Sequence, residues 1–315
     1  MNSIHQQSCP RLCDDAGNDL ALVHLGRRLQ ADRYRFITVT PLTHQRVNAR
    51  PENHQARTLR DIFGWSRPFD PGLLPASELQ SLRAAGLLRA HGGLWLSEVR
   101  WSSLDDALFV HSCFPTSDHD SVFFGPDTYR FAQAIKDHLR SSTQRIQRAV
   151  DIGCGSGVGA ILIAQARRDA QVLAVDINPT ALRYTAVNAA LAEVENVATQ
   201  PSDLLSNTLG QFDLIVANPP YMLDASARAY RHGGGSLGAG LSLRIVEQAL
   251  NRLAPGGSLL LYTGVAMVDG RDPFLDTVLP RLDEKRFGWT YRELDPDVFG
   301  EELLNPGYQR VDRIA

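Results

Sequence analysis

Cysteine, lysine and long apolar runs are all scarce in this chain of 315 residues. The four cysteines, Cys9, Cys13, Cys113 and Cys154, lack the spacing of a zinc ribbon or zinc finger, so we expect no metal site. No stretch is long and apolar enough to span a membrane, and the first residues lack the basic segment and apolar run of a signal peptide. These absences favour a cytoplasmic protein with reduced thiols and no membrane partner.

An excess of charge of one sign is also missing. The chain has 32 Lys and Arg against 35 Asp and Glu, a net charge of −3, which excludes a globally basic nucleic-acid coat but not a local basic patch. Lys136 and Lys285 are the only lysines, so the cationic surface is almost wholly guanidinium. The stretch from Arg27 to Arg60 holds eight arginines against Asp32 and Glu52. Guanidinium groups suit planar oxyanions, although genomic base composition explains an arginine bias equally well.

Residues 1–115 predict a small α+β domain, and the 43% hydrophobic content of the chain leaves ample material for a core. The expected elements are helices at 19–30, 58–65 and 75–85, a strand at 34–40, a loop at 41–57 and a hairpin of 87–90 with 94–99. Helix, helix and hairpin is the order of a winged helix, so we interpret residues 1–115 as a substrate-recognition or lid domain. A small cap domain that borrows this packing is the plainer alternative.

Residues 116–315 alternate strand-like and helix-like segments. Buried strands are expected at 149–152, 172–175, 212–217 and 258–262, with helices at 159–169, 179–192 and 243–253. Strands that are separated by helices pair in parallel, with helices on both faces of the sheet. This half of the chain is therefore expected to form a doubly wound, mostly parallel α/β domain.

A glycine-rich turn follows the first of these strands: Asp151 comes first, and Gly153, Gly155 and Gly157 alternate after it. Glycine lets a ligand approach the backbone because no Cβ stands in the way. Asp176 ends the next strand, 19 residues after Gly157, where its carboxylate can accept both ribose hydroxyls of an adenosine group. Neither Gly-x-Gly-x-x-Gly nor Gly-x4-Gly-Lys-Ser/Thr occurs, which argues against NAD and ATP.

Asn218-Pro219-Pro220-Tyr221 stands at the end of strand 212–217 and resembles the signature of methyltransferases that act on planar amino nitrogens. An amide or aryl amine is a poor nucleophile because its lone pair is delocalised. If its two N–H groups donate to the Asn218 side-chain oxygen and the Pro219 carbonyl, its lone pair is held toward the methyl group. The prolines fix φ and remove backbone donors, and Tyr221 can stack on the planar group. A plain turn after a strand is the structural alternative.

Together these motifs resemble those of class I S-adenosylmethionine-dependent methyltransferases. The resemblance implies a seven-stranded, mostly parallel sheet, with S-adenosylmethionine as cofactor and S-adenosylhomocysteine as product. It implies that the glycine turn packs against the amino-acid part of the donor, where Asp151 orients the ammonium group. Asp176 and its neighbour Ile177 would bind the adenosine, and Asp203 or its neighbour would meet the adenine amino group.

A third motif lies ahead of the first sheet strand. Pro126-Asp127-Thr128 resembles the Pro-Asp-Thr-Glu of HemK/PrmC-like protein-glutamine methyltransferases, with Tyr129 in place of Glu. The resemblance implies that this segment closes over the methyl donor, with Phe124 and Pro126 beside it. A capped helix start, with Asp127 or Thr128 as the cap, is compatible with this role.

The sequence leaves open which molecule accepts the methyl group and whether the protein is an enzyme or a non-catalytic binding protein. The HemK/PrmC-like resemblance favours methylation of a protein glutamine side chain, whereas the Arg27–Arg60 stretch favours a guanine or adenine amino group of ribosomal RNA. A small biosynthetic metabolite is a third acceptor, and a non-catalytic S-adenosylmethionine-binding regulator is the alternative from another class. We expect no DNA partner. His232, in the loop after Tyr221, is either a general base or a solvated side chain.

Overall fold

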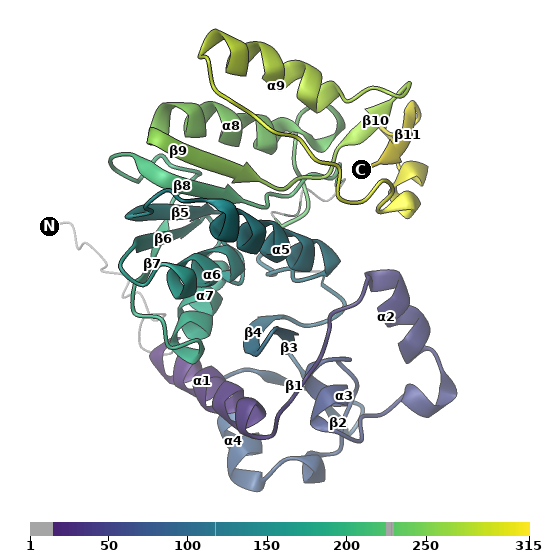
Figure 1. The fold of residues 1–315 in the computed structure, drawn as a ribbon. Coiled ribbons are helices and arrows are strands. Elements are labelled where there is room, and N and C mark those ends of the chain that lie inside the picture. The colour runs from purple at the N-terminus through teal and green to yellow at the C-terminus, as the bar shows by residue number, and fades with distance from the viewer. Residues whose placement is uncertain (1–14, 117, 225–227, 229) are drawn as a thin grey trace, which may run out of the picture. The chain divides into compact units, whose positions relative to one another are not determined.

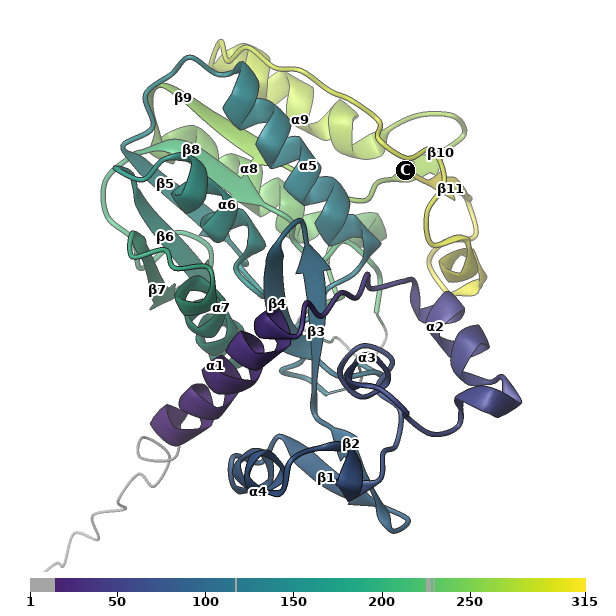
Figure 2. The ribbon, with the colours of Figure 1, turned by 60° about the horizontal axis from the view of Figure 1, so that its bottom comes forward.

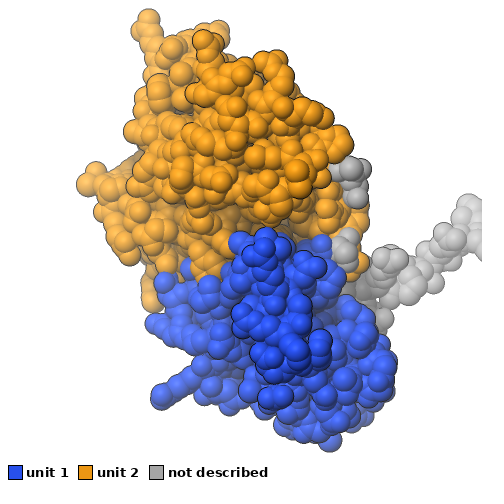
Figure 3. All heavy atoms as spheres, turned by 90° about the vertical axis from the view of Figure 1, so that its right-hand side faces the viewer, with its two compact units in different colours: residues 1–116, 190–193 blue, residues 117–189, 194–315 orange. Residues whose placement is uncertain are grey.

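The computed structural model describes residues 15–116, 118–224, 228 and 230–315 (Figure 1, Figure 2). The chain forms two compact units, which are coloured separately in Figure 3. The first contains Met1–Thr116 with Ala190–Glu193, and the second contains Ser117–Ala189 with Val194–Ala315. Cys9 and Cys13 lie outside the described residues. Among the described helices, none is long and apolar enough to cross a membrane.

The helices of the first unit confirm three expected helices and add one. They are α1 (Asp15–Ala31), α2 (Pro41–Asn48), η1 (Pro51–Asn53), α3 (Leu59–Phe63), η2 (Pro71–Leu73) and α4 (Ala76–Ala84). Helix α3 begins at a capping box in which Thr58 and Asp61 each satisfy a backbone N–H of the other. The prediction of a loop at 41–57 is wrong for Pro41–Asn48, which form α2. Pro41 takes the first helical position, and the Thr40 hydroxyl accepts the Thr43 N–H.

The strands of the first unit form two hairpins, of which one was expected. Strand β1 (Leu88–His91) pairs antiparallel with β2 (Leu94–Ser97), which confirms the prediction. Strand β3 (Val99–Leu104) pairs antiparallel with β4 (Ala107–Ser112). Every residue of β3 is buried, including the polar Arg100, Ser102 and Ser103, so the strand does not have one buried and one exposed face.

The strand expected at 34–40 is wrong, although the alternation that suggested it is real. Tyr34, Phe36 and Thr38 are buried, and the segment runs beside β3. The Ser103 N–H donates to the Phe36 carbonyl at 2.7 Å, but the Phe36 N–H donates to the Ser103 side-chain oxygen at 3.1 Å. Because a side chain replaces one main-chain partner, no regular ladder forms.

The order of elements that suggested a winged helix is present as α3, α4 and the β1–β2 hairpin. The same unit also holds α1, α2 and the β3–β4 hairpin. The winged-helix interpretation is therefore not confirmed.

The second unit is built on a five-stranded sheet in the order β7-β6-β5-β8-β9, in which all neighbours are parallel. Its strands are β5 (Arg148–Ile152), β6 (Gln171–Asp176), β7 (Val197–Pro201), β8 (Phe212–Ala217) and β9 (Leu253–Leu261). The chain moves outward from β5 to β6 and β7, then returns to β8 on its other side. At such a reversal, the loops after the two central strands part and leave a crevice at their carboxyl ends.

Helices cover both faces of this sheet and confirm the doubly wound α/β prediction (Figure 1, Figure 2). They are α5 (Pro126–Ser141), α6 (Val158–Ala166), α7 (Pro179–Leu191), α8 (Gly240–Arg252) and α9 (Pro273–Glu284). Successive β5 side chains point to opposite faces. Ala149 packs in one apolar cluster with Ile135 of α5 and Ile163 of α6. Val150 packs in a second cluster with Ile245 of α8.

The C-terminal strands stand apart from the main sheet. Strand β10 (Ala266–Val268) pairs antiparallel with β11 (Val311–Ile314) in a separate two-stranded sheet. The seven-stranded sheet implied by the resemblance is therefore not confirmed: the main sheet has five strands. Between α9 and β11 the described chain is irregular apart from the short helix η4 (Gly300–Leu304), so it offers no further strand to the edge at β9.

Candidate active site

A cavity of about 220 Å³ opens at the carboxyl ends of β5, β6 and β8, where the strand order predicts a crevice. Its lining is wholly in the second unit. The cavity brings together most of the predicted site residues: Asp151, Gly153, Gly155, Asp176, Ile177, Asp203, Asn218, Pro219 and Tyr221. The described lining does not include Phe124, Pro126 or Gly157.

The glycines of the turn after β5 divide into two kinds. Gly153 and Gly155 border the cavity at positive φ, and a Cβ on Gly153 would meet no atom within 4 Å. Gly157 is the left-handed N-cap of α6 at φ 80°, and a Cβ there would lie 2.7 Å from the Thr185 side chain. The first two therefore expose backbone to the cavity, whereas Gly157 allows α6 to pack closely.

Asp176 ends β6 and holds the glycine turn in place. One carboxylate oxygen accepts the Gly155 N–H at 3.0 Å, and the other accepts the Asn178 N–H at 2.9 Å. An ionised carboxylate has about four lone-pair sites, so each oxygen can still accept a hydroxyl from a ligand. Burial raises the pKa of Asp176. Ile177, which follows it, is 63% exposed and can cover an apolar ligand face.

Asp151 directs a carboxylate oxygen into the protein. Its Oδ2 accepts the Ala160 N–H of α6 at 2.9 Å, and a Cβ on Gly159 would collide with the carboxyl group. Burial raises the pKa of Asp151 to about 7, and the negative charge of Asp176 acts in the same direction. This carboxylate therefore anchors the first turn of α6 as well as bordering the cavity.

Asp203 borders the cavity from the loop after β7. Both of its carboxylate oxygens accept hydrogen bonds from one nitrogen of Arg244 in α8, at 3.1 and 2.9 Å. The two side chains are more than half exposed, so the pair adds little stability. It does fix the position of Asp203 at the rim.

Asn218 and Asp127 meet at the inner end of the cavity, and the sequence did not predict this pair. The Asn218 side-chain amide donates to Asp127 Oδ2 at 3.4 Å. Within the part of the chain that the structure describes, Asn218 Oδ1 and Asp127 Oδ1 are buried without a hydrogen-bond partner. Since unpaired buried acceptors cost free energy, both oxygens are suited to receive donors from a bound molecule.

Tyr221 is more firmly packed than a free stacking platform would be. It is 7% exposed, and its ring leaves no room for a Cβ on Gly264. Phe299, from the C-terminal tail, borders the same cavity with its ring centroid 6.1 Å from that of Tyr221. Burial raises the pKa of the Tyr221 hydroxyl well above its ordinary value.

The aromatic residues that border the cavity differ from the expected ones. Phe124 is fully buried and meets the edge of Tyr129 at 5.3 Å between ring centroids. Phe123 and Tyr230 border the cavity instead, with nearly parallel rings whose centroids are 6.4 Å apart. Pro126 occupies the first position of α5, which confirms the expected helix start, but the N-cap is Gly125 rather than Asp127 or Thr128.

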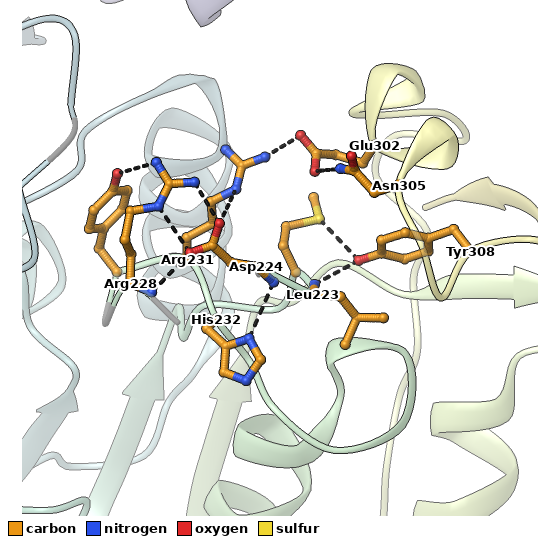
Figure 4. Close-up of polar contacts among 10 residues, drawn as sticks. Leu223, Asp224, Arg228, Arg231, His232, Glu302, Asn305 and Tyr308 are labelled. Carbon is orange, nitrogen blue, oxygen red and sulfur yellow. Dashed lines mark hydrogen bonds and ion pairs between the residues drawn. The ribbon is translucent and has the colours of Figure 1, made fainter. Parts of the chain in front are cut away.

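Ion pairs tie the loop after Tyr221 to the C-terminal tail (Figure 4). Arg228 donates to Asp224, and Arg231 bridges Asp224 to Glu302 in η4. The Arg228 hydrogen bonds hold the pKa of Asp224 at about 2. Arg231 borders the cavity, and neither it nor Phe299 was predicted, because the pairing joins segments about seventy residues apart.

His232 supports this loop. Its Nδ1 accepts the Asp224 N–H at 3.2 Å, and His232 is not part of the described cavity lining (Figure 4). On the other side of the loop, the Leu223 N–H donates to the Tyr308 hydroxyl at 2.8 Å. Both contacts fix the backbone that follows the Asn-Pro-Pro-Tyr motif.

The residues present fit the S-adenosylmethionine that the resemblance implies. Gly153 and Gly155 leave backbone exposed to the cavity, and Asp176 keeps lone pairs for two hydroxyls. Ile177 and Leu204 supply apolar surface on the same wall. Asn218 and Asp127, whose Oδ1 atoms have no partner among the described residues, border the same cavity.

Comparison with known proteins agrees with this geometry. The model of the methyltransferase small domain matches residues 131–268. The release factor glutamine methyltransferase of Deinococcus radiodurans is 32% identical over 197 residues, which are 59% of this chain and 66% of that protein. The ribosomal protein uL3 glutamine methyltransferase of Bordetella pertussis is 38% identical over 132 residues, 38% of this chain and 44% of that protein.

The chain spans just under two thirds of the length of release factor methyltransferases that it matches. Among solved structures, M. jannaschii TYW2 in complex with AdoMet has a TM-score of 0.47 at 14% identity, over 68% of this chain and 87% of that one. The family match covers all five strands of the main sheet and helices α6 to α8, and it includes the glycine turn, Asp176 and the Asn-Pro-Pro-Tyr motif. Residues 131–268 are therefore similar to the methyltransferase small domain family.

Proposed function

We propose that the protein transfers a methyl group from S-adenosylmethionine to the side-chain nitrogen of a protein glutamine. The observation that carries this proposal is the unpartnered, buried Asn218 Oδ1 at the end of β8, in the same cavity as Asp176. An acceptor oxygen there suits the N–H group of an amide. The relatives support this acceptor, because their names are those of glutamine methyltransferases.

When bound, S-adenosylmethionine supplies a methyl group on a positively charged sulfur. Asp176 would accept its ribose hydroxyls, Gly153 and Gly155 would lie against its amino-acid part, and Asp203 would lie near the adenine. The other residues that the resemblance assigns to the donor, namely Asp151, Ile177, Gly157, Phe124 and Pro126, remain part of the proposal. The structure gives Phe124 and Gly157 packing contacts that support the donor-binding segments from behind.

The acceptor amide is held by Asn218 and the backbone that follows it. One amide N–H would donate to Asn218 Oδ1 and another to the Pro219 carbonyl, which leaves the nitrogen lone pair directed at the methyl group. The two prolines fix the backbone of this segment, and Tyr221 would form an apolar wall. Catalysis would then come mainly from orientation, with no metal ion.

We further propose that residues 116–315 are the methyltransferase domain and residues 1–115 recognise the substrate or act as a lid. The helix–helix–hairpin order of α3, α4 and β1–β2 supports a winged-helix-like module. Cys113 and Cys154 form no disulfide within the described structure, which suits a cytoplasmic location.

One observation favours a second acceptor, an amino group of ribosomal RNA. Arg46, Arg50, Arg57 and Arg60 are exposed on the first unit, and Glu52 and Asp61 are the acidic residues nearest to them in sequence. Phosphate groups would neutralise such a cluster. A small metabolite as acceptor, or a regulator without catalysis, has no comparable support.

The test is the fate of labelled methyl groups. Purified protein would be incubated with a cell extract and labelled S-adenosylmethionine, and the label would be followed into protein, RNA and small molecules. We expect label in protein with the wild type and none above background with Asn218→Ala. Label in RNA would establish the second acceptor, and equal labelling by the variant would contradict the role of Asn218.

A further inference from the structure

Asp127 carries an unused hydrogen-bonding group at the inner end of the cavity. Its side chain lies in the first turn of α5, is 8% exposed and borders the cavity. Oδ2 accepts the Asn218 amide, whereas Oδ1 is buried and, among the described residues, has no partner. A buried carboxylate oxygen without a hydrogen-bond donor lowers the stability of the fold. A donor from a bound molecule would remove this cost.

The neighbouring side chain has the same feature. Asn218 also keeps its Oδ1 buried and unpartnered in the described structure, and the two side chains are joined by the 3.4 Å hydrogen bond. Two acceptor oxygens on adjacent side chains match the two N–H donors of a primary amide. In the proposed function Asn218 Oδ1 serves one donor, and Asp127 Oδ1 is placed to share the other N–H with the Pro219 carbonyl.

We propose that Asp127 contacts the acceptor nitrogen and takes its proton during methyl transfer. This inference rests on the proposed function. The nitrogen lone pair forms the new nitrogen–carbon bond while the carbon–sulfur bond breaks, and that electron pair stays on sulfur as a neutral thioether. The methylated nitrogen then carries one proton too many. Asp127 Oδ1 accepts this proton, becomes a neutral carboxyl group and later releases it to water.

The surroundings of Asp127 favour proton transfer. Burial raises the pKa of Asp127, which makes its carboxylate a better base. The charged and titratable groups that face it are Arg130 on α5, Tyr221 after β8 and Tyr262 after β9. Arg130 is paired with Asp295 at 2.6 Å, so its charge is already balanced. Both tyrosine hydroxyls have raised pKa values and remain neutral when Asp127 is charged.

A purely structural role at the start of α5 is the competing explanation. A carboxylate near a helix N-terminus is stabilising, and Asp127 occupies the first turn. The cap itself is formed by other groups, because the Gly125 N–H donates to the Thr128 hydroxyl and the Thr128 N–H donates to the Gly125 carbonyl. Neutralising Asp127 while keeping its shape should therefore spare the helix.

The experiment compares the wild type with Asp127→Asn and with Asp137→Asn, a more exposed acid on the same helix. We expect Asp127→Asn to bind S-adenosylmethionine with unchanged affinity by calorimetry and to lose about 100-fold in methylation rate. The rate of the wild type should fall at acid pH as Asp127 becomes protonated, and the variant should lack this fall. Asp137→Asn should match the wild type in all three measurements.

A second readout needs no methyl donor. In the donor-free protein, the carboxyl carbon resonance of Asp127 should shift when N-acetyl-glutamine methylamide is added, and Asn218→Ala should abolish this shift. The inference would be overturned if Asp127→Asn methylated within threefold of the wild-type rate, or if its rate fell at acid pH as the wild-type rate does. It would also be overturned if the Asp127 carbon resonance did not shift at the solubility limit of the amide. Failure of the wild type to methylate any fraction would instead refute the proposed function.

Discussion

Acid should destabilise the first unit through His44, and the size of the effect follows from its surroundings. His44 is fully buried, its Nε2–H donates to the Trp65 carbonyl at 2.8 Å, and its Nδ1 faces the Arg100 guanidinium at 3.5 Å. Burial, together with the positive charge of Arg100, lowers the pKa of His44 from 6.5 to about 4. The folded chain therefore holds this ring neutral over a range in which the unfolded chain protonates it.

The sign and magnitude follow from proton linkage. Between pH 6.5 and about 4, the unfolded state binds one proton that the folded state does not, so stability falls as pH falls through this window. At about 1.4 kcal/mol per pKa unit, the shift corresponds to at most about 3 kcal/mol, fully lost below pH 4. His111 adds to the loss, because burial lowers its pKa as well.

The assay is urea unfolding at a series of pH values, followed by tryptophan fluorescence. Trp65, Trp95 and Trp101 lie in the first unit, so the signal reports mainly on that unit. His44→Gln should show a smaller fall in unfolding free energy between pH 6.5 and 4 than the wild type. His54→Gln, at an exposed position, controls for the loss of a histidine. Parallel pH profiles for the wild type and His44→Gln would refute the reasoning.

Two further predictions concern the glycine turn and the donor site. Gly157→Ala should lower the free energy of unfolding by about 2–4 kcal/mol, because it combines a positive φ with a collision at Thr185. At Gly86, φ is also positive but a Cβ would meet open space, so Gly86→Ala should lower the free energy of unfolding by only about 1 kcal/mol. Equal losses of stability for the two variants in thermal unfolding would contradict the packing argument. Asp176→Ala should weaken S-adenosylmethionine binding at least tenfold by calorimetry, through the loss of hydroxyl acceptors and of support for Gly155. Unchanged affinity would remove the ribose role of Asp176.

The fold of the second unit was predictable because its signals are local. Short apolar strands alternate with helical segments, and the polar residues that end β5, β6 and β8 must meet at one edge of a parallel sheet. The predicted glycine turn, Asp176 and Asn218 therefore converge in one cavity. In the first unit, α1, α3, α4 and the β1–β2 hairpin were found for the same reason.

The features that were missed depend on contacts between distant segments. Asp127 meets Asn218 across 91 residues, and Phe299 reaches the cavity from the irregular segment between α9 and η4. Strand β3 buries Arg100, Ser102 and Ser103, whose polarity hides a core strand. Ser102 hydrogen-bonds His111 at 2.7 Å across the β3–β4 hairpin, inside the unit.

The central claim is that Asn218 positions a glutamine side-chain nitrogen for methylation, and one measurement tests it most directly. Proteins labelled by the wild type would be digested and sequenced by mass spectrometry, beside a sample treated with Asn218→Ala. The account predicts a methyl group on the side-chain nitrogen of glutamine with the wild type, and none with the variant at equal donor binding. A methyl group on another residue type, or an identical pattern with Asn218→Ala, would contradict it.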